Sequence, residues 1–182
     1  MISRPIVGLA VAILVCACAT VPGAPAARSG NPILQGWYAD PEAHVFDGQY
    51  WIYPTYSAPY DQQTFLDAFS SRDLVTWTKH ATNPVIAQTP PDLDLVGFRD
   101  HCVWKEGDVW RQIVGSGIRG RGGAVLLYES NDLREWSYLG PLLVGDVDDR
   151  PRDAPDWTGT MWECADLFSL DGQGEERDIL VF

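Results

Sequence analysis

A repeat of about 60 residues constrains the fold of this chain more than any other feature of its sequence. Two residues recur at an offset of 59, since Gly48 and Trp51 are followed by Gly107 and Trp110. A longer pattern recurs at the same offset, in which Ser71-x-Asp73-Leu74-x-x-Trp77 becomes Ser130-x-Asp132-Leu133-x-x-Trp136. In repeat proteins each unit buries its hydrophobic face against the next unit. The chain is therefore expected to be built from similar units packed side by side.

Each unit has the pattern of four β-strands. A strand with an acidic motif is followed by an Asp-Gly or Glu-Gly turn, a strand rich in aromatic and β-branched residues, another strand, and the Asp-Leu-x-x-Trp segment before an outermost strand. This order is typical of a β-propeller blade. The units span about residues 31–90 and 91–150, and a third starts near Thr158 and has a turn at Asp171-Gly172. No helical periodicity of useful length occurs, so the predicted fold is an all-β, incomplete propeller of about two and a half blades.

Three short acidic motifs follow the same period. They are Tyr38-Ala39-Asp40-Pro41, Phe98-Arg99-Asp100-His101 and Met161-Trp162-Glu163-Cys164. Asp100 comes 60 residues after Asp40, and Glu163 comes 63 residues after Asp100. One carboxyl group per repeat would gather several carboxylates around one axis, as acid/base cleavage of a glycosidic bond requires. Asp40, Asp100 and Glu163 are therefore the predicted catalytic residues.

The neighbours of these carboxyl groups indicate how they would work. Arg99 precedes the second carboxylate, and its guanidinium can either hold a carboxylate ionised or grip a sugar hydroxyl. Glu163 lies between Trp162 and Cys164, an apolar setting that favours a carboxyl group with a proton to donate. Tryptophan rings suit sugar stacking, although most of the eight are expected in the core. The predicted substrate-binding residues are Trp37, Arg99 and Trp162.

Each motif also has a simpler interpretation. Asp40 precedes a proline, and Asp-Pro pairs are common in turns. Asp100 and Arg99 could form a surface ion pair, and Glu163 could be an ordinary glutamate of an edge strand. The recurrence of all three motifs with the repeat favours the functional interpretation.

These motifs resemble those of the five-bladed propeller glycosidases of glycoside hydrolase families 32 and 43. Residues 31–51, which include Trp37-Tyr38-Ala39-Asp40-Pro41-Glu42, are similar to the opening of family 43 enzymes. From Phe98 onward the chain resembles family 32, whose Arg-Asp-Pro motif corresponds to Arg99-Asp100 with His101 in place of proline. The likeness continues through Gly115-Ser116-Gly117 and residues 123–136 to Trp162-Glu163-Cys164-Ala165, which resembles the family's Trp-Glu-Cys-Pro motif.

The resemblance implies a role for each carboxyl group. Asp40 would be the nucleophile if family 32 is the guide, or the general base if family 43 is. Asp100 would stabilise the transition state, and Glu163 would be the acid/base. The implied function is that of a β-fructofuranosidase acting on sucrose or fructans without a cofactor. The alternatives are a family 43 arabinofuranosidase or xylosidase and a carbohydrate-binding propeller remnant without catalysis.

The spacing of the motifs departs from both families in one respect. There, about two blades separate the first aspartate from the Arg-Asp motif, whereas one blade separates Asp40 from Asp100. The likeness also changes family around residues 81–97, and the chain ends inside the apolar run of residues 179–182. We therefore expect a truncated or rearranged relative that lacks a blade and in which the circular order of the carboxylates is broken.

The net charge of −12 opposes binding to nucleic acid, because such partners normally meet a basic surface. The predicted partner is an oligo- or polysaccharide. His44, His80 and His101 are scattered without ligand spacing, so no metal site is predicted. Cys102 and Cys164 each lie beside an acidic motif and could pair, although two free, buried thiols are favoured.

The N-terminus has the pattern of an export signal. Residues 1–18 combine Arg4 with an apolar stretch too short to span a membrane. Val15-Cys16-Ala17-Cys18 resembles a lipobox, which would make Cys18 the lipid-modified residue, while residues 17–19 and 24–26 offer ordinary cleavage sites. Residues 19–30 would form a flexible tether before a propeller domain at 31–182. We expect an exported protein, anchored by lipid at the cell surface or in the periplasm, or else secreted.

Overall fold

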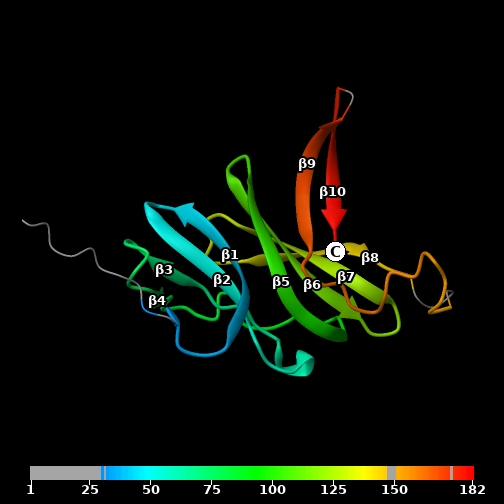
Figure 1. Cartoon of the computed structure of the whole chain (residues 1–182), viewed down its shortest axis with the longest axis horizontal. Coiled ribbons are helices and arrows are strands. Elements are labelled where there is room, and N and C mark those ends of the chain that lie inside the picture. The colour runs from blue at the N-terminus through cyan, green and yellow to red at the C-terminus, as the bar shows by residue number, and fades with distance from the viewer. Residues whose placement is uncertain (1–29, 31, 147–150, 173) are drawn as a thin grey trace, which may run out of the picture.

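The computed structural model describes residue 30 and residues 32–146, 151–172 and 174–182. These residues form two four-stranded antiparallel sheets and one two-stranded hairpin, which lie side by side (Figure 1). The predicted all-β propeller of about two and a half blades is confirmed in this part of the chain. The predicted signal peptide lies outside the described residues, and so does the predicted tether except for its last residue.

The strands follow chain order within each blade. The first blade contains β1 (Tyr38–Phe46), β2 (Gln49–Tyr56), β3 (Phe69–Ser71) and β4 (Thr78–Lys79). The second contains β5 (Leu95–Glu106), β6 (Val109–Ile118), β7 (Gly122–Ser130) and β8 (Ser137–Val144). The third unit is the hairpin of β9 (Asp166–Gly172) and β10 (Glu175–Val181). A 3-10 turn, η1 (Tyr60–Gln62), is the one helical element in the described residues, and none of their helices could cross a membrane.

The repeated Ser-x-Asp-Leu segment precedes the outermost strand of each complete blade, as predicted, and it forms the same turn in both. The Leu74 backbone nitrogen donates to Ser71 Oγ at 2.9 Å, and the Leu133 nitrogen donates to Ser130 Oγ at 2.9 Å. In each turn the aspartate Oδ1 accepts hydrogen bonds from the two backbone nitrogens that follow the leucine. Both leucines have a left-handed backbone, with φ of 62° and 63°. The local hydrogen bonds make this conformation tolerable for a residue with a large side chain.

The other predicted match, between Trp51 and Trp110, is wrong by one residue. Tyr50 pairs with Ser71 across the first sheet as Trp110 pairs with Ser130 across the second, so Tyr50 is the counterpart of Trp110. Because side chains alternate along a strand, Trp51 points to the opposite face of its sheet. The two tryptophans therefore approach one hydrophobic cluster from facing blades.

The turn of the third unit also lies later than predicted. Asp171 and Gly172 both belong to β9, and Gly172 pairs with Glu175 at the start of β10. The strand thus runs two residues further than the Asp-Gly pair indicated.

Two hydrophobic interfaces hold the units together. The first joins the two complete blades through the buried side chains of Trp51, Tyr53, Ala68, Val103, Trp110 and Leu133. Across it, Tyr53 Oη donates a hydrogen bond to the Leu133 carbonyl oxygen at 2.9 Å. The second joins β6 and β7 to the segment before β9 through Ile113, Val125, Trp162 and Ala165. These interfaces place β5 in contact with both β1 and β9, so the three acidic motifs come together.

Candidate functional site

Asp40 and Asp100 occupy equivalent irregularities in the first strands of their blades. The β1–β2 ladder shifts its register between Ala39 and Glu42, and the β5–β6 ladder shifts beside Asp100. Both aspartates have a left-handed backbone, with φ of 47° and 51°. The third residue with this conformation in an acidic motif is Cys164, with φ of 51°. Glu163 thus precedes the equivalent position by one residue, so the third carboxyl group leaves the backbone at a different point of its motif from the first two.

Glycines of the second blade make room for the third motif. A Cβ at Gly115 would lie 2.7 Å from the Trp162 carbonyl oxygen, and one at Gly123 would overlap the Trp162 ring. The Trp162 backbone nitrogen donates to the Ser116 carbonyl oxygen at 3.0 Å. The segment before β9 therefore lies directly on the backbone of β6, and this close approach sets the position of Glu163.

Arg99 connects all three predicted catalytic carboxylates. Its Nε lies 3.0 Å from Asp100 Oδ1, its Nη2 3.5 Å from Asp40 Oδ2, and its Nη1 3.4 Å from Glu163 Oε1. Burial alone lowers the pKa of Arg99, but the hydrogen bond to Asp100 and the surrounding carboxylates raise it, so the guanidinium stays charged. One cation therefore holds the three carboxyl groups together.

The three carboxylates differ in accessibility. The side chains of Asp40 and Glu163 are 46% and 42% exposed, whereas that of Asp100 is 3% exposed. Asp100 is held from two sides, since its backbone nitrogen donates to Thr55 Oγ1 at 3.0 Å and its Oδ2 accepts from the Cys164 nitrogen at 3.1 Å. Asp40 and Glu163 are thus free to meet a ligand, while Asp100 is fixed beneath them.

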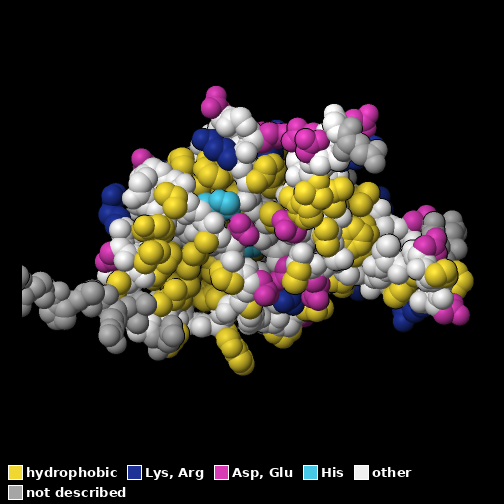
Figure 2. Space-filling model, turned by 45° about the horizontal axis from the view of Figure 1, so that its top comes forward, with side chains coloured by type: hydrophobic (Ala, Val, Ile, Leu, Met, Phe, Trp, Pro, Cys, Tyr) yellow, Lys and Arg dark blue, Asp and Glu magenta, His cyan; other side chains and the backbone are white. Residues whose placement is uncertain are grey.

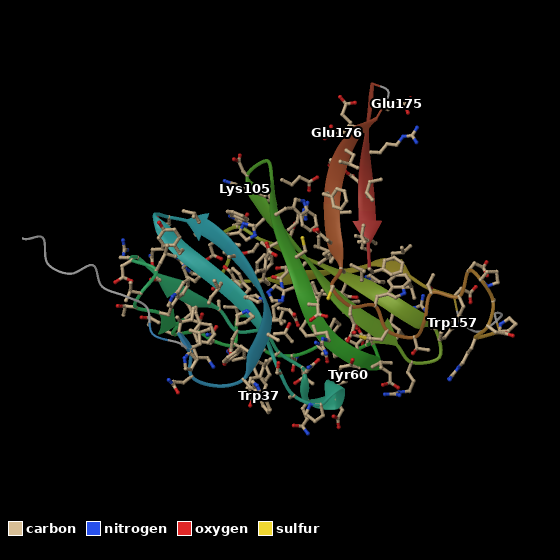
Figure 3. The ribbon with its side chains drawn as sticks, in the orientation of Figure 1. Trp37, Tyr60, Lys105, Trp157, Glu175 and Glu176 are labelled. Atoms are coloured by element: carbon tan, nitrogen blue, oxygen red, sulfur yellow. The ribbon has the colours of Figure 1, made fainter. Side chains whose placement is uncertain are left out.

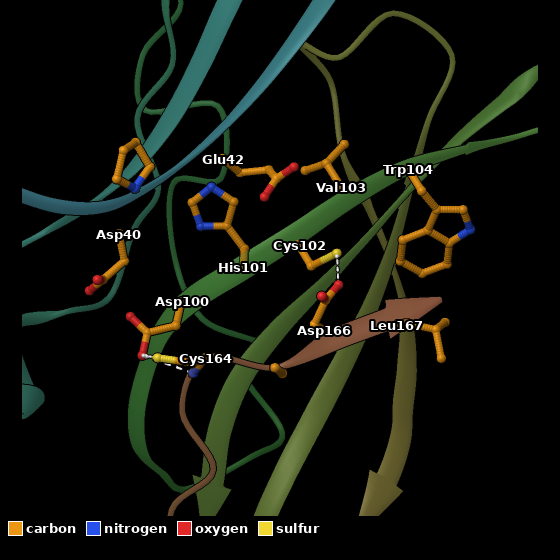
Figure 4. A pocket seen from close by; sticks show the side chains of 12 residues that line it. Asp40, Glu42, Asp100, His101, Cys102, Val103, Trp104, Cys164, Asp166 and Leu167 are labelled. Atoms are coloured by element: carbon orange, nitrogen blue, oxygen red, sulfur yellow. Dashed lines mark hydrogen bonds between the residues drawn. The ribbon is translucent and has the colours of Figure 1, made fainter. Parts of the chain in front are cut away.

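A cavity of about 500 Å³ opens beside Asp40 and Asp100 (Figure 4). It runs along the inner strands, and its walls also include Glu42, Cys102 and Asp166. The surface over this region carries acidic side chains between two areas of hydrophobic side chains (Figure 2). The site is therefore strongly acidic and suits an uncharged, hydroxyl-rich ligand better than an anionic one.

Two pKa shifts describe the electrostatics at this cavity. Burial raises the pKa of Asp40, the nearby Asp100 carboxylate raises it further, and Arg99 opposes both effects. Burial lowers the pKa of His101 to about 4, so this side chain adds no positive charge at neutral pH. Arg99 is left as the cation that moderates repulsion between the carboxylates.

Glu163 lies in polar surroundings, and the apolar setting predicted from its sequence neighbours is wrong. Its Oε1 accepts a hydrogen bond from Tyr60 Oη at 2.7 Å and lies close to Arg99. Trp162, the preceding residue, turns into the interface with the second blade. Neighbours in sequence point to opposite sides of an extended segment, so they do not define one another's environment.

The two tryptophans predicted to bind substrate have opposite positions. Trp37 is 79% exposed and lies with Arg99 and Tyr56 on the wall of a second open pocket. Figure 3 shows it at the same edge of the molecule as Tyr60. Trp162 is 3% exposed, stacks on Phe182 and donates from Nε1 to the Thr158 carbonyl oxygen. This burial argues against the predicted contact between Trp162 and substrate.

Sequence reasoning missed two residues of the site and misjudged the exposure of a third. Tyr60 and Thr55 carry no motif, and only the fold brings them to Glu163 and Asp100. Cys164 was noted as a free thiol, which is confirmed, but it is exposed rather than buried. In the described residues, no group of three or more His, Cys, Asp or Glu side chains could hold a metal ion.

Comparison with known proteins identifies the family to which this chain belongs. The sequence model of the glycosyl hydrolases family 32 N-terminal domain matches residues 35–182. A β-D-galactofuranosidase of Aspergillus niger is 65% identical over 63 residues, which cover 35% of this chain and 18% of that protein. A sucrose-6-phosphate hydrolase of Escherichia coli is 36% identical over 104 residues, covering 57% of this chain and 19% of its own length.

A solved structure has a similar fold over most of this chain. The family 32 β-fructofuranosidase BmSUC1 of Bombyx mori matches with a TM-score of 0.58 and 29% identity, covering 77% of this chain and 28% of that one. The chain spans about a fifth of the two curated relatives and about a quarter of this structure. Since the family match covers most of the chain, the protein belongs to glycosyl hydrolase family 32.

Proposed function

We propose that this chain carries the catalytic carboxylates of a retaining β-fructofuranosidase that acts on sucrose or fructans. The observation that carries the proposal is the convergence of Asp40, Asp100 and Glu163 on the Arg99 guanidinium. The sucrose-6-phosphate hydrolases and β-fructofuranosidases among its relatives support the choice of substrate. Of the two roles left open for Asp40, family membership favours the nucleophile.

In the first step, a carboxylate oxygen of Asp40 attacks the anomeric carbon of the fructosyl unit. The bond from this carbon to the leaving oxygen breaks while Glu163 gives that oxygen its proton. The product is an ester between Asp40 and the sugar, together with a released alcohol. The exposure of Asp40 and Glu163 is what this step requires of them.

In the second step, Glu163 is a carboxylate and acts as the base. It takes a proton from a water molecule, whose oxygen attacks the anomeric carbon and breaks the ester to Asp40. The free sugar leaves, and both carboxyl groups return to their starting protonation. Asp100, fixed by Arg99 and the Cys164 nitrogen, would bind sugar hydroxyls as positive charge develops on the ring.

The test is hydrolysis of sucrose, levan and 4-nitrophenyl α-L-arabinofuranoside by the purified chain and its variants. We expect release of fructose from sucrose or levan, a loss of about 10²- to 10⁴-fold in kcat for Glu163→Gln, and a larger loss for Asp40→Asn. Glu176→Gln, on the exposed surface of β10, is the matched control and should behave as the wild type. Failure to release fructose, or equal activity of Glu163→Gln and the control, would contradict the proposal.

A second candidate is hydrolysis of another five-membered-ring sugar. The Aspergillus niger relative, named as a β-D-galactofuranosidase, has the highest identity of the relatives described above, over about a third of this chain. Turnover of 4-nitrophenyl β-D-galactofuranoside or the arabinofuranoside without release of fructose would favour it. Sugar binding without turnover of any substrate would favour the carbohydrate-binding remnant instead.

We also propose that the protein is exported and anchored through a lipid on Cys18. The support is the sequence pattern of residues 1–18. When the protein is expressed in a bacterial host supplied with labelled palmitate, the wild-type protein should carry the label and the Cys18→Ser variant should not. An unlabelled, processed wild-type chain would indicate ordinary signal cleavage and secretion.

A further inference from the structure

Tyr60 contacts the site from a segment that carries no catalytic motif. The turn η1 connects β2 to β3 in the first blade and reaches across to the third unit. Tyr60 Oη donates a hydrogen bond to Glu163 Oε1 at 2.7 Å, and the guanidinium of Arg99 lies over the phenol ring, with its Cζ 5.3 Å from the centroid. Tyr60 therefore touches two members of the site supplied by the second blade and the third unit.

Both polar contacts of the Glu163 side chain meet at one oxygen. Oε1 accepts from Tyr60 and lies 3.4 Å from Arg99 Nη1, and no other hydrogen bond or ion pair reaches this carboxyl group from the described part of the chain. The side chain is otherwise 42% exposed and would sample several rotamers. Two contacts on Oε1 fix the plane of the carboxyl group and leave Oε2 as the oxygen that can carry the transferable proton.

The contact also matches the chemistry of proton donation. Before transfer, a protonated Oε2 leaves Oε1 as a carbonyl oxygen, which accepts the Tyr60 hydrogen bond. After transfer, Glu163 is a carboxylate, and hydrogen bonds to a charged acceptor are roughly twice as strong as neutral ones. An interaction that strengthens as the proton leaves lowers the barrier more than it stabilises the ground state.

We propose that Tyr60 is a positioning residue for the acid/base, which holds Glu163 so that Oε2 faces the leaving-group oxygen. The inference rests on the proposed function, because it assigns Tyr60 to the proton-donation step of that reaction. A positioning role differs from a purely structural role in one respect. Loss of the Tyr60 hydroxyl should slow a substrate in proportion to its leaving group's need for a proton.

The kinetic test compares two substrates in Tyr60→Phe, which keeps the ring beneath Arg99 and removes only the hydroxyl. Sucrose needs protonation of its leaving oxygen, whereas 4-nitrophenyl β-D-fructofuranoside releases a stable phenolate without it. We expect kcat/KM, which reports the first step alone, to fall about 10-fold on sucrose and to change less than about 2-fold on the nitrophenyl substrate. Tyr138→Phe, a matched change on the outer strand β8, should leave both unchanged. Equal slowing of both substrates by Tyr60→Phe would overturn the inference.

A second measurement does not depend on activity. The Glu163 contact, ahead of burial, raises the pKa of Tyr60, while Arg99 opposes and Asp100 adds to this shift. With ¹³C-labelled tyrosine, the Tyr60 signal can be assigned by its loss in Tyr60→Phe and followed as pH rises. Glu163→Gln should lower the pKa of Tyr60, and an unchanged titration would overturn the inference because the contact would be absent.

The two measurements separate the inference from the proposed function. If the wild type releases fructose but Tyr60→Phe slows both substrates alike, the function stands and the positioning role falls. If the titration shifts but the wild type hydrolyses neither substrate, the proposed function falls, and the positioning role falls with it because no proton is donated. A shifted titration together with a selective loss on sucrose supports both.

Discussion

Leu133 and Leu74 occupy the same turn in consecutive blades, yet one is buried and the other is 50% exposed. Both turns have the same hydrogen bonds and the same left-handed leucine. Leu133 packs against Trp51 and Tyr53 of the first blade, whereas no described residue covers Leu74 in this way. The comparison teaches that the turn is made locally, while its contribution to stability depends on the blade that precedes it.

The same contrast separates Trp162 from Trp37 and gives the largest expected effect. Trp162→Ala would remove a buried ring from the second interface and should lower the free energy of unfolding by about 3–5 kcal/mol. Trp37→Ala should change it by less than about 0.5 kcal/mol, because the ring is 79% exposed. Urea unfolding followed by circular dichroism gives both values. Equal losses would mean that the second interface is not formed as described.

The two leucines provide the direct test of the comparison. Leu133→Ala should lower the free energy of unfolding by about 2–5 kcal/mol, since it leaves a cavity in the cluster between the blades. Leu74→Ala should cost less than about 1 kcal/mol, because it removes a side chain that is half in solvent. The difference between the two variants is measured from their denaturant midpoints, provided that the m-value is the same for both. A large cost at Leu74 would show that another surface covers it in solution.

Relief of burial and charge repulsion at Asp40, in the candidate site, should appear as a smaller gain in stability. A carboxyl group whose pKa is raised on folding destabilises the folded state where it is ionised, and the penalty disappears at low pH, where it is protonated in both states. Asp40→Asn should therefore raise Tm at pH 7 by no more than about 2 °C, a gain limited by solvent screening, and leave Tm unchanged near about pH 3. Scanning calorimetry at both values checks the sign, and a lower Tm at pH 7 would contradict it.

The smallest expected effect concerns the aspartates of the two turns. Hydrogen bonds from the Thr76 and Val75 backbone nitrogens lower the pKa of Asp73 to about 2. The stabilisation is complete above the ordinary value of 3.8 and is lost as pH falls toward about 2. Asp73→Asn should flatten the decline of Tm over this window. Asp132→Asn should act in the same direction, since its pKa is also lowered by hydrogen bonds that outweigh burial; opposite signs would show that the turns are not equivalent.

How much of the fold could be predicted follows from the range of each interaction. The strands, their order in the blade and the place of the Ser-x-Asp-Leu segment depend on side-chain alternation and on hydrogen bonds within a few residues, so the repeat was sufficient to predict them. The equivalence of Trp51 and Trp110 was wrong because a shift of one residue reverses the face on which a side chain lies. A pattern of matching residue types does not detect such a shift.

The candidate site, like the fold, could be predicted from the sequence only in part. The types and approximate spacing of Asp40, Asp100 and Glu163 were visible in the sequence, and with them the class of chemistry. The sequence by itself thus determined a repeated acidic blade, because that information is local and periodic. The contact of Arg99 with three carboxylates, the hydroxyl of Tyr60 on Glu163 and the burial of Trp162 join residues far apart in the chain. Only the tertiary structure decided these, because they depend on how one sheet packs against the next.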